Sequence, residues 1–240
     1  FFLTTLSFNS YATIEIDITE GNREPLPIAI TNFFHDGNEK ITNTDLPSKI
    51  RGVIQNDLES TGLFNSIDEK AFIQESKSLH LKPRFADWRL INSQGLVTGD
   101  LKIEDERLKV EFRLWDTLAE KEIEGLVLIT TPDNWRRISH MIADKIYERL
   151  TGEEGYFDTR IVYVAEEGPK NNRVKKLAIM DQDGANHKFL TSGKELVLTP
   201  RFNPVRQEIT YLSYFKNLPR VYLLNIQTGI QEVVGDFPGM

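Results

Sequence analysis

The spacing of hydrophobic residues changes near residue 150 of the chain. Before that point, residues 46–60 and 132–150 carry apolar side chains three and four positions apart, which predicts two amphipathic α-helices. After it, apolar residues come in short runs separated by polar turns, a pattern typical of β-strands. We therefore expect two domains, an α/β domain at 13–152 and an all-β domain at 153–240.

Four segments between the two predicted helices indicate a sheet. Residues 86–91, 96–103, 107–115 and 123–129 are rich in apolar side chains and are separated by polar turns, so we predict each of them as a strand. The apolar stripes of the helices need a partner to cover them. We therefore expect the two helices to lie on one face of a mixed, largely antiparallel sheet.

The connection between the second helix and the first strand of the β domain is short. Gly152 follows the end of the helix, where a left-handed cap is common, and Gly155 allows a second turn before the apolar run 161–164. So short a connection should hold the two domains in close register. We call residues 150–164 the joint, and its candidate positions are Gly152, Gly155, Phe157 and Arg160.

The β domain contains a repeat. The run 161–164 recurs as 209–212, and 177–181 recurs as 222–225, roughly 45 to 50 residues further along. Each unit has two longer strands, a polar hairpin and a last short strand, which predicts the four-stranded blade of a β-propeller. About two blades fit into the chain, and two blades cannot close a ring that covers its own sheet edges.

Three motifs together resemble the TolB family. They are L-T-G-x-x-G-x-F-x-T-R-I-x-Y-V at 150–164, D-x-D-G at 181–184 and P-x-F-x-P at 200–204. The resemblance runs from residue 13 to the end of the chain. It implies an α/β amino-terminal domain followed by the start of a six-bladed propeller, and hence a truncated sequence.

The resemblance also implies a function. TolB proteins are non-catalytic periplasmic adaptors of the Tol-Pal system, which maintains outer-membrane integrity and constricts the envelope at cell division. The implied partners are TolA, at the inner membrane, and the peptidoglycan-associated lipoprotein Pal. No cofactor is implied, and the chain is expected to be monomeric.

The segment that would engage TolA is the amino-terminal arm at 13–24. Its first residues alternate apolar and acidic side chains, which predicts a half-buried strand. Such a strand is either an ordinary edge strand of the first domain or, as the resemblance implies, an arm that binds TolA by strand addition. The candidate arm residues are Thr13, Ile14, Glu15, Ile16, Asp17, Ile18 and Thr19.

The resemblance places the Pal-binding face on propeller loops that precede the inner strands. Two stretches of this type are expected in the chain, the second at its end. The candidate residues are Glu195, Leu196, Val197, Leu198, Thr199, Phe237, Pro238, Gly239 and Met240.

Residues 1–12 resemble the end of a signal peptide. An apolar stretch is followed by Ser10, Tyr11 and Ala12, a small-x-small pattern that predicts cleavage after Ala12. The mature protein would then begin at Thr13 and be exported to the periplasm. The alternative is an apolar first strand.

Charge and composition argue against several classes of protein. The net charge of -7 and the pI near 5.3 do not suit a partner with a phosphate backbone, so we expect no nucleic-acid binding. The absence of cysteine excludes disulfides, thiolate zinc sites and cysteine nucleophiles. No apolar run approaches the roughly 18 to 20 residues of a membrane-spanning helix, so no direct span is expected.

We find no catalytic or metal-binding motif in the sequence. The histidines at 35, 80, 140 and 187 share no ligand spacing, and the residues at 181–184 predict a hairpin turn rather than a calcium loop. Two alternatives to the adaptor stay open. One is the propeller domain of a prolyl-oligopeptidase-like serine peptidase, against which the helix-covered sheet before Gly152 counts. The other is a propeller scaffold for a different envelope or secreted partner.

Overall fold

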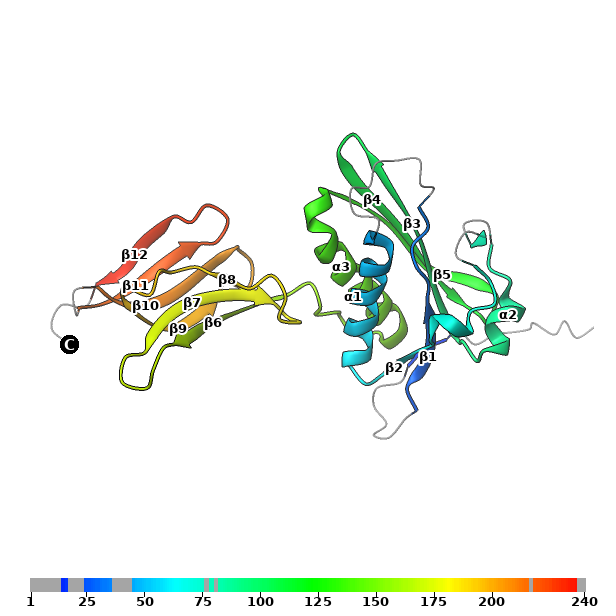
Figure 1. Ribbon diagram of the computed structural model, residues 1–240, viewed down its shortest axis with the longest axis horizontal. Coiled ribbons are helices and arrows are strands. Elements are labelled where there is room, and N and C mark those ends of the chain that lie inside the picture. Colours follow the sequence, from blue (N-terminus) through cyan, green and yellow to red (C-terminus); the bar gives the residue numbers. More distant parts are fainter. Residues whose placement is uncertain are drawn as a thin grey trace, which may run out of the picture. The chain divides into compact units, whose positions relative to one another are not determined.

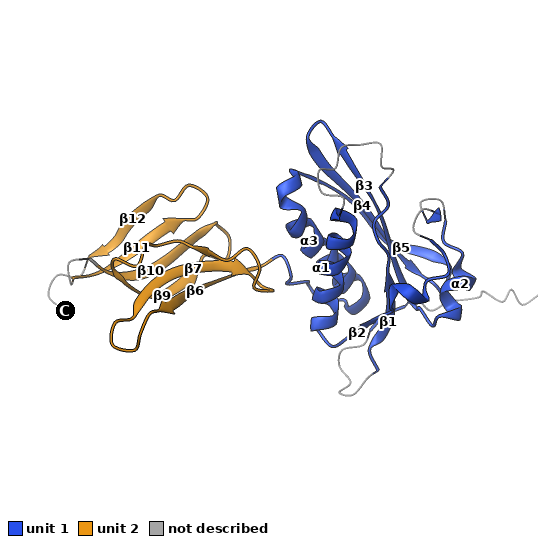
Figure 2. Ribbon diagram, in the orientation of Figure 1, with its two compact units in different colours: residues 1–158 blue, residues 159–240 orange. Residues whose placement is uncertain are grey.

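A computed structural model shows two compact units, residues 1–158 and 159–240 (Figure 2). The positions of the units relative to each other are not determined, so each is described by itself. The structure describes residues 14–16, 24–35, 45–75, 78–79, 82–215 and 218–236.

The first unit is built on a mixed five-stranded sheet with the order β2-β1-β3-β4-β5. β1 pairs in parallel with β2 and β3, and β3, β4 and β5 pair antiparallel. The three long antiparallel strands are those predicted at 96–103, 107–115 and 123–129. The strands are β1 (Leu26–Ile30), β2 (Phe64–Ser66), β3 (Gly95–Glu104), β4 (Arg107–Asp116) and β5 (Lys121–Thr130).

Two helices, α1 (Leu46–Ser60) and α3 (Trp135–Thr151), lie side by side on one face of this sheet (Figure 1). Their apolar stripes form one core with the sheet, in which Ile54, Ile142 and Phe112 are fully buried. The helix-covered mixed sheet expected from the sequence is thereby confirmed. A 3-10 turn, η3 (Pro132–Asn134), precedes α3, so the α-helix begins three residues later than Pro132 suggested.

The opposite face of the sheet carries a feature that the sequence analysis misassigned. Residues 86–91 were predicted as a strand, but α2 (Phe85–Leu90) is a short helix. Phe85 and Trp88 share one helix face and are buried in a second apolar cluster with Leu96 and Trp115 of the sheet. An apolar residue at every second position suggested a strand, but burial of Phe85 and Trp88, three positions apart, fits one face of a helical turn.

The second unit consists of two antiparallel sheets, the start of a propeller. The first sheet has three described strands and the second has four. A shared apolar cluster contains Leu177 and Ile179 from the first sheet and Val197, Ile209 and Leu224 from the second. The strands are β6 (Arg160–Glu167), β7 (Val174–Asp181), β8 (Lys188–Phe189), β9 (Leu196–Phe202), β10 (Glu208–Phe215), β11 (Leu218–Asn225) and β12 (Gln231–Asp236).

In the part of the chain that the structure describes, every helix is too short or too polar to cross a membrane.

Candidate functional site

Of the seven candidate arm residues at 13–19, the structure describes residues 14–16, and these contact the rest of the first unit. The backbone N–H of Ile14 donates to Oδ2 of Asp116 at 2.9 Å, and the N–H of Ile16 donates to the carbonyl of Leu150 at 2.5 Å. Ile16 is buried in the core, Ile14 packs partly against it, and Glu15 is exposed. The side chains therefore follow the predicted alternation.

The predicted strand is nevertheless wrong for these three residues, which belong to no strand. The N–H group of Ile14 donates to a side-chain carboxylate and that of Ile16 to a helix carbonyl, and neither donates to the backbone of a neighbouring strand. Thr13 and residues 17–19 lie outside the described residues, as do residues 1–12 with the expected cleavage site.

Asp116, at the end of β4, is the carboxylate that receives Ile14. Its residue is 1% exposed, and its other oxygen, Oδ1, accepts the backbone N–H groups of Leu118 at 2.9 Å and Ala119 at 2.8 Å. One side chain thus holds both the turn between β4 and β5 and the arm. The sequence analysis did not single out Asp116, although an aspartate at the start of a turn often accepts amides two or three residues on.

The carbonyl that receives Ile16 belongs to the last turn of α3. The last four carbonyls of a helix have no partner within the helix, so a donor from elsewhere stabilises this end. Gly152 follows with a φ of 76° and donates its N–H to the carbonyl of Glu148 at 2.9 Å. The left-handed cap predicted at Gly152 is confirmed.

Beyond this cap, the joint packs against α3 through Asp144. Its Oδ1 accepts the N–H of Phe157 at 2.6 Å, and its Oδ2 accepts the N–H of Asp158 at 3.1 Å. Burial raises the pKa of the Asp144 carboxyl, and this effect outweighs the two backbone hydrogen bonds, which lower it. Phe157 is fully buried, and its ring centre lies 5.8 Å from that of Tyr147.

The two other joint residues, Gly155 and Arg160, make contacts that the sequence did not predict. Gly155 was predicted to allow a turn, but its backbone does not need a positive φ. Instead, a Cβ at this position would lie 2.5 Å from Cα of Asp144, so the glycine permits a close approach to the helix. Arg160 begins β6 and donates a hydrogen bond to the side chain of Gln207 within the second unit.

The first of the two expected propeller loops is not a loop. Leu196 to Thr199 form the first half of β9, which pairs with β10, and Val197 is buried in the apolar cluster. This strand was missed because the second repeat unit was taken to begin with the run at 209–212, which is β10. Glu195 precedes the strand, and its carboxylate accepts a hydrogen bond from the Ser213 hydroxyl at 2.8 Å. Residues 237–240 lie outside the described residues.

A buried polar pair between the two long helices was also missed. Nδ1 of His140 on α3 lies 2.6 Å from Oδ2 of Asp57 on α1, and the side chains are 3% and 1% exposed. In the sequence, Lys49, Arg51, Asp57 and Glu59 give the helix a mixed-charge face, a pattern that predicts a solvated surface. For Asp57 this prediction is wrong, because α3 packs over the position and supplies a hydrogen-bonding partner.

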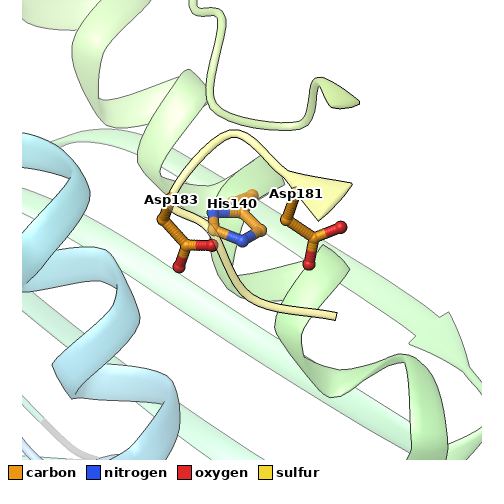
Figure 3. Close-up of side chains that lie close together, drawn as sticks. All are labelled: His140, Asp181 and Asp183. Carbon is orange, nitrogen blue, oxygen red and sulfur yellow. The ribbon is translucent and has the colours of Figure 1, made fainter. Parts of the chain in front are cut away.

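Figure 3 shows His140 on its helix, the carboxylate of Asp181 at the end of β7 and the carboxylate of Asp183 on the turn that follows. These are side chains of types that bind divalent metals. They belong to different units, and we infer no site across the units. Within the second unit the predicted hairpin turn is confirmed: Gly184 has a φ of 85°, and its N–H donates to the carbonyl of Asp181 at 3.0 Å.

Comparison with known families identifies both units separately. Residues 14–123 match the family model described as the TolB amino-terminal domain. Residues 147–240 match the model described as the TolB beta propeller domain. The two matches follow one another in the order that the sequence motifs indicated.

Individual relatives agree with these matches. The chain is 59% identical to the Tol-Pal system protein TolB of Pelagibacter ubique, over 98% of this chain and 54% of the relative. It is 56% identical to the Tol-Pal system protein TolB of Paramagnetospirillum magneticum, over 95% of this chain and 51% of the relative. The chain therefore spans about half the length of these curated relatives.

A solved structure has a similar fold. The crystal structure of TolB from Acinetobacter baumannii matches 95% of this chain and 53% of its own, with a TM-score of 0.75 and 26% sequence identity.

Proposed function

Because the chain belongs to the TolB family, we propose that it is part of a non-catalytic adaptor of the Tol-Pal system that binds other proteins of the cell envelope. The observation that carries the proposal is the match of both units, in order, to the two domains of TolB. The proposal places the protein in the periplasm, with its leader cleaved after Ala12.

The first proposed partner is TolA, which would bind the arm at 13–19. The docked geometry supports a switch. Strand addition needs free backbone groups along the incoming segment, whereas the N–H groups of Ile14 and Ile16 are already donated to the first unit. While the segment is docked in this way, the edge that carries these two N–H groups is therefore closed to a partner strand. In the proposal, TolA selects the released state of the arm.

The second proposed partner is Pal, bound by the propeller. The candidate surface in the described part of the chain is the segment around Glu195 and the exposed side chains at the start of β9. Residues 237–240, which lie outside the described residues, stay candidates from the sequence. Leu196 is 44% exposed although its neighbour Val197 is buried, so β9 presents an apolar side chain that a partner could cover.

A titration of both partners tests this proposal. The chain that begins at Thr13 is compared with a variant that begins at Glu20, by calorimetric titration with purified TolA and purified Pal. We expect the shorter variant to lose TolA binding and still to bind Pal. Unchanged tryptophan fluorescence of the shorter variant serves as the folding control. Equal TolA affinity of the two chains would contradict the proposed arm.

The same titration separates the alternatives. A propeller scaffold for a different partner would bind neither TolA nor Pal. The peptidase alternative requires a hydrolase domain beyond Met240, which the gene sequence would show. The helix-covered mixed sheet of the first unit and the family matches both favour the adaptor.

A further inference from the structure

We propose that Asp116 and the Leu150 carbonyl form a receptor site that holds the segment 14–16, and that Asp116 sets how firmly the segment is held. Only the consequence for TolA rests on the proposed function. The receptor itself is inferred from the contacts alone.

The first step concerns the two acceptors. Asp116 is almost fully buried, and a buried carboxylate must be satisfied by donors. Two turn amides bind Oδ1, and the Ile14 N–H binds Oδ2. Hydrogen bonds to an ionised acceptor are roughly twice as strong as neutral ones. The carboxylate is therefore a stronger anchor for a backbone N–H than a neutral side chain would be.

The second step concerns what the site selects. Ile14 and Ile16 pack on the core of the first unit, whereas Glu15 between them is exposed. A peptide that fits needs branched apolar side chains two positions apart, with a donating N–H on each, and tolerates any residue between them. The chemical class of the ligand is thus a short apolar-x-apolar segment, here supplied by the chain itself.

The third step links the site to the joint. Ile16 donates to a carbonyl in the last turn of α3, so the docked segment stabilises that end of the helix. Asp158, the last residue of the first unit, follows Leu150 by eight residues. Release of the segment should therefore loosen the end of α3 as well.

The test is amide hydrogen exchange on the full chain, comparing the wild type with Asp116→Asn. Asparagine keeps one oxygen, which the two turn amides should retain, and replaces the other by a nitrogen that cannot accept from Ile14. We expect exchange at Ile14 and Ile16 to become about ten- to a hundredfold faster, the range for losing one hydrogen bond to a charged group. Exchange at Leu118 and Ala119 should stay the same.

Two further variants keep the test decisive. Glu15→Gln changes an exposed side chain of the same segment and should leave all four rates unchanged. Ile16→Ala removes a buried apolar contact and should accelerate exchange in the segment without touching Asp116. Unchanged rates at Ile14 and Ile16 in Asp116→Asn would overturn the inference. Equal acceleration in the turn and the segment would also overturn it, because the substitution would then loosen the whole region instead of releasing the segment.

A TolA titration of Asp116→Asn separates this inference from the proposed function. If the receptor site and the proposed function both hold, the variant binds TolA more tightly than the wild type, because less binding energy is needed to release the segment. The gain in affinity is at most the factor by which amide exchange accelerates. Faster exchange at Ile14 and Ile16 with unchanged TolA affinity would support the receptor and count against the arm as the TolA site.

Discussion

His140 and Asp57 form a hydrogen-bonded pair inside the first unit, where most buried residues are apolar. The pair joins the two helices that cover the sheet. Burying such groups costs free energy, which their mutual hydrogen bond offsets only while both partners are present. The pair therefore need not add to the stability of the fold, but replacing either residue alone should destabilise it.

We predict that Asp57→Ala or His140→Ala alone lowers the free energy of unfolding by about 3 kcal/mol, because each leaves a buried polar partner behind. The double change Asp57→Leu with His140→Leu should recover most of the loss. Denaturant unfolding followed by tryptophan fluorescence measures this. All three tryptophans, Trp88, Trp115 and Trp135, lie in the first unit.

The control is Glu59→Ala, an exposed residue on the same helix, which should change stability by less than about 0.5 kcal/mol. If the two buried single variants were as stable as this control, the pair would have no structural role.

At the scale of elements, the joint packs closely against the helix it follows. Asp144, one turn beyond His140, holds the backbone of the joint, and Phe157 fills the core beside Tyr147. The close approach of Gly155 to Asp144 makes this packing possible. The joint is thus anchored up to Asp158 by side chains of the first unit.

Two glycine substitutions should therefore act in opposite directions. Gly155→Ala places a methyl group against the backbone of Asp144 and should lower the free energy of unfolding by about 1 to 3 kcal/mol. Gly52→Ala, in the middle of α1, meets no atom within 4 Å and should raise it by about 0.5 to 1 kcal/mol. Thermal and denaturant unfolding of both variants measures the difference. A loss of stability at both positions would show that the packing at Gly155 is not special.

The elements that the sequence predicted well are those with long, regular patterns. The apolar stripes of α1 and α3, which include Ile54 and Ile142, repeat over several helical turns. The alternation along β4 likewise repeats over several residue pairs. Patterns of this length predict the conformation reliably, and the tertiary packing agrees with them. α2 and the start of β9 are short, and their pattern fits both a strand and another conformation. Contacts with distant residues decide the conformation adopted: α2 is buried against Trp115, and β9 pairs with β10.

At the scale of the whole molecule, the functional candidates fall into two groups. The arm was found in the sequence because its alternation is local. Its receptor was not, because Asp116 lies 102 residues from Ile14 and no local pattern connects them. The Asp57 and His140 pair, 83 residues apart, was missed for the same reason. Contacts between distant residues depend on the fold, which a single sequence specifies only indirectly.

The central claim is that the chain is an adaptor whose two partners influence each other through the arm. The most direct test is a calorimetric titration of TolA into the full chain alone and into the chain saturated with Pal. We expect the TolA affinity to change by about five- to 150-fold, and the Pal affinity to change by the same factor when TolA is added first. Identical TolA affinities with and without Pal would contradict the account.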